Sequence, residues 1–259
     1  MTWSLQQNSI LKKIVIIPAR LDSERLPEKP LKMINQKPMI EWTYQAACNS
    51  IADEVYVATD SEKINKAVNG FNGKVFMTSN LHKTGTDRVF EVANNLELKD
   101  EDIVINVQGD EPFTDPEDIN NIFRSFFRSE ENTDTQIKNL LAHEMTTLYS
   151  AHETVSPKNN PNQVKIKVDE CISLDFSRKI YGDTSDWFIH LGIYGYKYSC
   201  LKNFVNWEQS KRELENKLEQ FRALDNGVLI KALPSKSLFH LGVDTPEDLE
   251  EANEIAKKI

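Results

Sequence analysis

Predicted strands and helices alternate through the first half of this chain, and this alternation restricts the fold more than any other feature of the sequence. The predicted strands are residues 13–18, 54–58, 74–77 and 102–107, and the predicted helices are residues 38–49, 61–68, 86–95 and 115–127. Alternation of this kind is typical of βαβ units, whose strands run parallel. We therefore predict an α/β fold in which residues 1–137 form a mostly parallel sheet covered by helices.

A different pattern begins at about residue 138, where strands follow one another without a helix between them. The expected elements are strands at 140–150, 164–176, 188–197 and 227–232, a loop at 156–163, and helices at 213–224 and 245–258. Successive strands of this kind are typical of an antiparallel insertion attached to the parallel half. We expect one compact unit with three segments: the parallel portion at 1–137, the insertion at 138–210, and C-terminal elements at 211–259.

The composition indicates a globular chain that does not bind nucleic acid. Hydrophobic residues make up 39% and charged residues 27% of the 259 residues, as is usual for globular domains. The formal net charge is -9, whereas binding to a phosphate backbone requires a basic surface. The first residues lack an apolar signal core, and the apolar runs are too short to span a bilayer. We expect no membrane insertion and a cytoplasmic location.

The cysteines support that location, and the histidines give no sign of a zinc site. The three cysteines form no Cys-x-x-Cys motif, and the five histidines lack the spacing of zinc ligands. Free thiols are typical of a reducing compartment.

A basic loop follows the first predicted strand. It carries Arg20, Arg25 and Lys29. Ligands of open parallel sheets bind beyond the carboxyl ends of the strands, so these cations are well placed to bind phosphates. The loop contains no glycine, which excludes a P-loop and a dinucleotide fingerprint. On composition alone, a solvated charged loop is the more ordinary interpretation.

Two carboxylates are candidates for binding a metal ion. Asp110 follows the strand at 102–107, and Asp244 precedes the helix at 245–258. Two carboxylates that meet at one edge of the sheet could hold Mg²⁺, which prefers one or two carboxylates together with substrate phosphates and water. The alternatives are a turn residue for Asp110 and a helix cap for Asp244.

Several motifs resemble, in order, those of the 3-deoxy-manno-octulosonate (KDO) cytidylyltransferases. Pro-Ala-Arg at 18–20 and Arg-Leu-Pro-Glu-Lys-Pro-Leu at 25–31 resemble the nucleotide signature of sugar nucleotidyltransferases. Further matching segments lie at 35–40, 57–60, 84–88, 107–112, 190–196, 219–222 and 242–249. The resemblance covers nearly the whole chain. It implies a Rossmann-like nucleotidyltransferase sheet (GT-A-like) and a reaction in which the 2-hydroxyl of an acidic keto sugar attacks the α-phosphorus of CTP.

The resemblance also implies roles for individual residues. The implied CTP-binding residues are Pro18, Ala19, Arg20, Arg25, Lys29, Gly85, Thr86 and Asp110. The implied sugar-binding residues are Arg88, Gln108, Arg178, His190, Tyr194, Glu219 and Gln220. Asp110 and Asp244 are the implied Mg²⁺ ligands, and together with Arg20 and Lys29 they form the implied catalytic set. The family implies a homodimer, with the insertion contributing to its interface and to the sugar site.

Two sugar-site residues have ordinary structural alternatives. His190 could be a hydrogen-bonded core histidine, and Glu219 could form a surface ion pair with Arg222 at i+3.

The segment after Arg178 departs from the family pattern, because it is short and lacks the usual prolines. This leaves the choice among KDO, an 8-amino variant and another ulosonic acid open. The alternatives for function are a cytidylyltransferase for a sialic-acid-like nonulosonate and a non-catalytic nucleotide-binding protein on the same fold.

Overall fold

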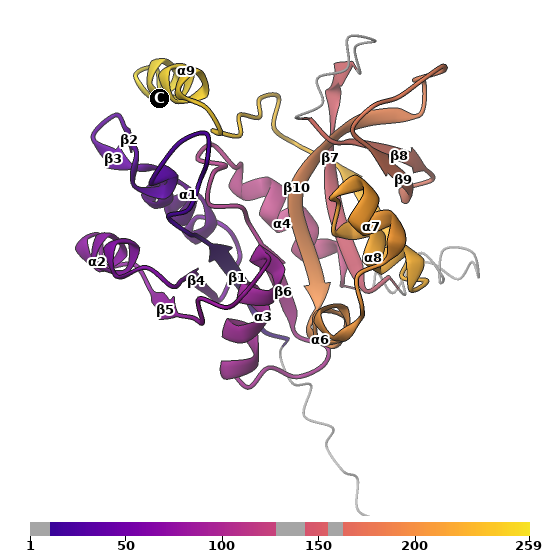
Figure 1. Cartoon of the computed structure of the whole chain (residues 1–259), viewed down its shortest axis with the longest axis horizontal. Helices are drawn as coiled ribbons and strands as arrows, with labels where there is room; N and C mark the ends of the chain where they lie inside the picture. Colours follow the sequence, from indigo (N-terminus) through magenta and orange to yellow (C-terminus); the bar gives the residue numbers. More distant parts are fainter. Residues whose placement is uncertain (1–10, 128–142, 155–162) are drawn as a thin grey trace, which may run out of the picture.

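A mixed nine-stranded sheet, in the order β5-β4-β1-β6-β10-β7-β11-β9-β8, forms the centre of the computed structural model, which describes residues 11–127, 143–154 and 163–259 (Figure 1). Its strands are β1 (Lys13–Pro18), β4 (Glu54–Thr59), β5 (Val75–Met77), β6 (Ile103–Asn106), β7 (Met145–Thr154), β8 (Lys165–Asp169), β9 (Ile172–Ser177), β10 (Trp187–Lys197) and β11 (Ile230–Pro234). A separate two-stranded hairpin consists of β2 (Met33–Ile34) and β3 (Lys37–Pro38).

Strand directions confirm the predicted mixed α/β fold. Strands β1, β4, β5 and β6 are parallel. Strand β10 runs antiparallel to both β6 and β7, and β11 is parallel to β7. The later strands thus extend the same sheet instead of forming a separate one. The pairing of Tyr194 with Asn106 sets the middle of β10 beside the carboxyl end of β6.

Helices cover both faces of the sheet because adjacent residues of each central strand point to opposite sides. Ile14 and Ile16 of β1 belong to one core, whereas Val15 and Ile17 belong to the other. The first core includes side chains of α3 (Gly85–Asn95), α6 (Tyr198–Asn206) and α8 (Gln220–Asp225), and the second those of α1 (Met39–Cys48), α2 (Glu62–Gly70) and α4 (Pro116–Ser125).

The C-terminal helix α9 (Pro246–Ala256) returns to the N-terminal half of the molecule, above β2, β3 and α1 (Figure 1). Ala252 and Ala256 pack in a third core with Leu26 and Ile34, while the side chain of Asn253 accepts a hydrogen bond of 3.0 Å from the backbone of Asn35. This docking places the segment that precedes α9 beside the loop that follows β1.

Two predicted elements are each divided in the structure. The strand predicted at 164–176 is a hairpin, because Glu170 and Cys171 adopt positive φ angles of 43° and 65° and reverse the chain between β8 and β9. The helix predicted at 213–224 is interrupted by Lys217, which has a left-handed φ of 54° and ends α7 (Lys211–Asn216) before α8 begins. Leu214, which has helical spacing to Leu218 and Phe221, is 59% exposed, whereas those two residues are buried.

Other elements were missed or lie elsewhere. Helix α6 was not predicted, and it follows β10 directly, without an intervening turn residue that would signal a new element. The short helix η1 (Lys29–Leu31) and the β2–β3 hairpin also carry no strong periodic pattern. The strand predicted at 227–232 is β11, displaced toward the C terminus. The start of the strand predicted at 140–150, most of the loop predicted at 156–163 and the boundary expected at 137/138 lie outside the described residues.

Candidate active site

The first cavity of the site lies at the carboxyl ends of β1 and β6. Its volume is about 250 Å³, and its lining includes the implied nucleotide residues Pro18, Ala19, Arg20, Lys29, Gly85 and Asp110. Gly109 allows the loops after these two strands to approach closely, because a Cβ atom there would lie 3.1 Å from the carbonyl oxygen of Pro18. The basic loop therefore lies beside the acidic turn.

Lys29 links the two predicted metal ligands. Its Nζ donates to Oδ2 of Asp110 at 2.5 Å and to Oδ1 of Asp244 at 2.8 Å. The other carboxylate oxygen of Asp244 contacts Nη2 of Arg25 at 2.9 Å. Cations and carboxylates from three separate segments thus form one cluster.

The cluster shifts the pKa values of Lys29 and Asp244. Burial acts to lower the pKa of Lys29, but Asp110 and Asp244 outweigh it, and the pKa is raised. Burial acts to raise the pKa of Asp244, yet the hydrogen bond and charge of Lys29, assisted by Arg25, lower it. Lys29 therefore stays an ammonium and Asp244 a carboxylate at neutral pH.

Backbone contacts hold the two acidic loops together. The backbone N–H of Val243 donates to the carbonyl oxygen of Asp110 at 2.9 Å. Helix α9 is capped by Thr245, whose side chain accepts from the backbone of Asp248 in a capping box. Because Thr245 is the cap, the alternative role of Asp244 as a helix cap is wrong, and its carboxylate faces Lys29 and Arg25 instead.

A third carboxylate, Glu111, lies beside the cluster and was not singled out from the sequence. Burial and the charges of Asp110 and Asp244 raise its pKa to about 8, although Lys29 acts in the opposite direction. An acidic residue directly after Asp110 was the signal that could have indicated it.

The second cavity, of about 420 Å³, adjoins the first and shares Gly85 and Gln108 with it. The implied sugar residues that line it are Gln108, Arg178, His190, Tyr194, Glu219 and Gln220. Thr86, implied for CTP, also lines this cavity. The structure therefore brings together residues from α3, β10 and the segments that follow β6, β9 and α7.

Arg88 is placed differently from the expectation. It lines the first cavity, not the one that contains Arg178 and His190. Its buried guanidinium donates to Oδ2 of Asp60 at 2.8 Å and to the hydroxyl of Thr78. Part of its hydrogen-bonding capacity is thus used within the protein.

His190 and Tyr194 form one wall of the second cavity. Burial lowers the pKa of His190 to about 3, so its imidazole is neutral at physiological pH. The hydroxyl of Thr147 lies 2.9 Å from its Nε2. The His190 ring also contacts Phe176 edge-on, with ring centroids 5.1 Å apart. His190 therefore has the partners of a core histidine and also faces the cavity.

Arg25 and His190 also border a third cavity, of about 370 Å³, together with Glu111 and Asp244. This cavity adjoins the second one, with which it shares His190 and Gly192. Arg25, implied for CTP, is thus not a lining residue of the first cavity, but Asp244 joins it to Lys29, which lines that cavity.

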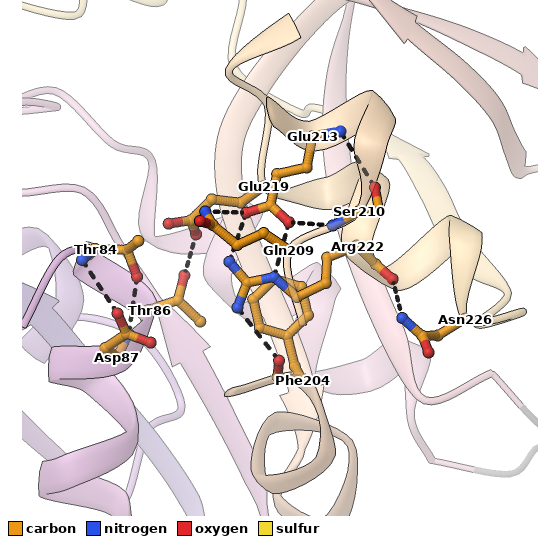
Figure 2. A network of polar contacts seen from close by, with 10 residues as sticks. All are labelled: Thr84, Thr86, Asp87, Phe204, Gln209, Ser210, Glu213, Glu219, Arg222 and Asn226. Atoms are coloured by element: carbon orange, nitrogen blue, oxygen red, sulfur yellow. Dashed lines mark hydrogen bonds and ion pairs between the residues drawn. The ribbon is translucent and has the colours of Figure 1, made fainter. Parts of the chain in front are cut away.

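Glu219 is not in the surface ion pair that its spacing suggested. Its Oε2 accepts a hydrogen bond of 2.6 Å from the hydroxyl of Thr86, while Arg222 pairs with Glu213 (Figure 2). Burial raises the pKa of Glu219, against the hydrogen bonds from Thr86 and Thr84 and the charge of Arg222. The alternative interpretation of Glu219 as a helix-surface partner of Arg222 is therefore wrong.

The two carboxylates that converge on Lys29 have the geometry and chemistry to hold one hard cation. Each contributes an oxygen within 2.8 Å of the same ammonium nitrogen, which marks a position where a positive charge is stabilised. Mg²⁺ prefers a site of one or two carboxylates completed by phosphates and water. Within the described ranges, no group of three or more histidine, cysteine or acidic residues forms an all-protein metal cage.

Comparison with known proteins points to one family. A family model described as cytidylyltransferase matches residues 14–232. The chain is 38% identical to a 3-deoxy-manno-octulosonate cytidylyltransferase of Vibrio parahaemolyticus, over 94% of this chain and 98% of that protein. It is 39% identical to a protein of the same name from Bacteroides thetaiotaomicron, over 95% and 99%.

A solved structure is similar over the same length. The structure of CMP:2-keto-3-deoxy-manno-octonic acid synthetase complexed with CTP superposes with a TM-score of 0.82 at 34% identity, covering 96% of this chain and all of that one (100%).

Among the helices of the described residues, none is both long and apolar enough to cross a membrane.

Proposed function

The chain belongs to the cytidylyltransferase family, among the 3-deoxy-manno-octulosonate cytidylyltransferases, and from this membership we propose how its site performs the reaction. The enzyme couples CTP to KDO. The 2-hydroxyl oxygen of the sugar forms a bond to the α-phosphorus of CTP, the bond from that phosphorus to the bridging oxygen of the β-phosphate breaks, and CMP-KDO and pyrophosphate result. The hydroxyl proton is lost to solvent or to pyrophosphate.

One geometric observation supports this assignment most directly. The first and second cavities meet at Gly85 and Gln108, beside the Lys29–Asp110 contact. A nucleotide in the first cavity and a sugar in the second would therefore have their reacting atoms at a common boundary. Holding two reactants in contact accounts for a large part of the catalysis of bimolecular reactions.

We assign the nucleotide to the first cavity. Arg20 and Lys29 would bind the β- and γ-phosphates and stabilise the charge of the leaving pyrophosphate. Arg25 would contribute its charge from the neighbouring third cavity. Gly85, at the N-terminal end of α3, lines both cavities and would border the base, whereas Thr86, also implied for CTP, lines the second cavity.

We assign the sugar to the second cavity. Arg178 would bind the sugar carboxylate, and the neutral His190 and Tyr194 would contact the hydroxyl groups. Glu219 and Gln220 offer further polar atoms from the start of α8. Gln108 lies at the boundary with the nucleotide. Because Arg88 lines the nucleotide cavity and pairs with Asp60, we place it at the junction of the two substrates.

Asp110 and Asp244 would hold Mg²⁺. When bound, the ion neutralises charge on the phosphate oxygens. Lys29 would then turn from the two carboxylates to the phosphates, since the ammonium and the ion compete for the same oxygens. Arg25 would keep its contact with Asp244 and orient that carboxylate.

We also propose a cytoplasmic homodimer that supplies activated KDO for lipopolysaccharide or another bacterial surface polysaccharide. These assignments are what the resemblance to the family implies. The nonulosonate enzyme and the non-catalytic nucleotide-binding protein are not favoured, because relatives named for KDO match nearly the whole chain.

Release of pyrophosphate on mixing the protein with CTP, Mg²⁺ and KDO tests the function. We expect stoichiometric pyrophosphate and CMP-KDO, with no release when KDO is omitted. The absence of both products under these conditions would refute the function.

A further inference from the structure

A buried ion pair joins α7 to α8 beside the second cavity. Arg222 donates to Glu213 through two nitrogens, from Nε to Oε2 at 2.9 Å and from Nη2 to Oε1 at 2.5 Å. The side chains are only 5% and 3% exposed. The guanidinium also donates to the carbonyl oxygen of Phe204 at 3.4 Å and lies 4.6 Å from the centroid of the Phe204 ring. Arg222 therefore fixes α8 to both α7 and α6 (Figure 2).

Helix α8 needs such an anchor because it is short. It has six residues, and a helix of that length is not stable on its own in water. Lys217, in the left-handed conformation, separates it from α7, so α8 does not continue a longer helix. Its orientation must come from tertiary contacts.

The residues at the start of α8 are the ones that face the cavity. Glu219 and Gln220 line it, whereas Glu213 and Arg222 are not among its lining residues. Glu219, which lines the cavity, is held by the hydroxyl of Thr86, and Arg222, three residues further along, is held by Glu213 (Figure 2). Leu218 and Phe221, which precede Glu219 and Arg222 in the chain, are buried in the core.

We propose that Glu213 and Arg222 are positioning residues for sugar binding, which hold α8 so that Glu219 and Gln220 present their polar atoms to the second cavity. The inference rests on the proposed function, because it takes the occupant of that cavity to be the acidic sugar. Neither residue touches the substrate in this arrangement; both act through the placement of α8.

Stability alone is a poor explanation for the pair. Replacing a buried ion pair with apolar residues of similar volume is often neutral or stabilising, whereas removing one partner leaves an uncompensated buried charge. What an apolar pair lacks is the two-point, directional contact between guanidinium and carboxylate. An apolar replacement of both residues should therefore keep the protein folded but lose the orientation of α8, so it distinguishes a positioning role from a role in folding.

The test is the double variant Glu213→Leu/Arg222→Met, which removes both charges and keeps apolar volume. We expect a folded protein in which the KM for KDO rises about tenfold or more, as for the loss of a contact to a charged group. The KM for CTP should stay within about twofold, because the first cavity does not involve α8. Arg222→Lys, which keeps the charge and loses the two-point contact, should give an intermediate KM for KDO.

Arg212→Met is the matched control. Arg212 joins the same two helices through Asp225, with Nε to Oδ1 at 2.7 Å, but both side chains are partly exposed. Exposed pairs contribute little, so the KM for KDO should stay near the wild-type value.

The outcomes are distinct. A wild-type KM for KDO in the folded double variant, or an equal rise in the KM for KDO and for CTP, would overturn the positioning role alone. A wild-type protein that does not use KDO would overturn the proposed function and this inference with it. Circular dichroism and a thermal melt of each variant establish that it is folded at the assay temperature.

Discussion

The carbonyl oxygen of Asp110 accepts a hydrogen bond of 2.9 Å from the backbone N–H of Val243, so the loop after β6 is fastened to the segment before α9. Asp244 follows directly, and its carboxylate reaches the same Lys29 ammonium as that of Asp110. A backbone contact is independent of side-chain charge. Changes to either carboxylate should therefore alter the chemistry of the site without separating the two loops.

Asp110→Asn and Asp244→Asn should each give a folded enzyme with kcat/KM lowered by at least about 10²-fold, the scale of losing one electrostatic stabiliser in an active site. Steady-state kinetics over a range of Mg²⁺ concentrations measure this. Asp22→Asn is the control, since Asp22 lines the first cavity without an ion pair to Lys29, and its effect should be much smaller. Near-normal activity of both test variants at saturating Mg²⁺ would remove the metal assignment.

Lys29→Ala should weaken the binding of CTP while leaving the binding of CMP little changed. The reason is that the proposed contacts of Lys29 are to the β- and γ-phosphates, which CMP lacks. Isothermal titration calorimetry with the two nucleotides measures the difference. Equal losses of affinity for CTP and CMP would show that Lys29 does not bind the distal phosphates.

Glu111 should make the metal-free protein less stable as the pH rises. Its pKa is raised from 4.5 to about 8 in the folded protein, so between these values the folded state holds a proton that the unfolded state has lost. The free energy of unfolding should therefore fall with rising pH across this range, by up to about 1.4 kcal/mol per pH unit.

Urea unfolding at several pH values measures this slope, and Glu111→Gln should flatten it and stabilise the protein at pH 8. Mg²⁺ should also reduce the slope in the wild-type protein, because a cation beside Asp110 and Asp244 favours ionised Glu111. An unchanged slope in the variant would assign the pH dependence to other groups.

The protein should be a homodimer in solution, as two-fold dimers are the commonest closed assembly and the family resemblance implies one. Light scattering at working concentration should give twice the mass of the 29.8 kDa chain. A monomer mass would contradict the proposal, and the short segment after Arg178 would be the first place to seek the cause.

KDO should be accepted as substrate, and an analogue without the carboxylate should not be turned over. A site built to bind a charged group leaves its own polar groups unpaired when that group is missing, and it rejects the analogue strongly. Assays of KDO, 8-amino-KDO and N-acetylneuraminate side by side measure the choice. A preference for N-acetylneuraminate over both octulosonates would overturn the assignment and favour a nonulosonate enzyme.

Much of the fold was predictable because its signals are local. Apolar runs and helical periodicity located β1, β4, β5 and β6 and the helices between them, and the alternation of the two predicted a parallel sheet. The divided elements were not predictable in this way. Lys217 and Cys171 adopt left-handed backbone conformations that lysine and cysteine disfavour. Their residue types therefore gave no indication that the chain turns at these positions.

The candidate site shows the same division. The sequence specifies which residues are available: a basic loop after one strand, an acidic turn after another, and ordered motifs that resemble one family. It did not specify the partners. Lys29 contacts Asp110 and Asp244, which are 81 and 215 residues away in the sequence. Helical spacing suggested an ion pair between Glu219 and Arg222, whereas in the structure Arg222 pairs with Glu213. The spacing of residues in the sequence indicates which side chains are neighbours within one helix or strand. Contacts between elements depend instead on how their apolar faces pack, and that packing is set by the whole chain.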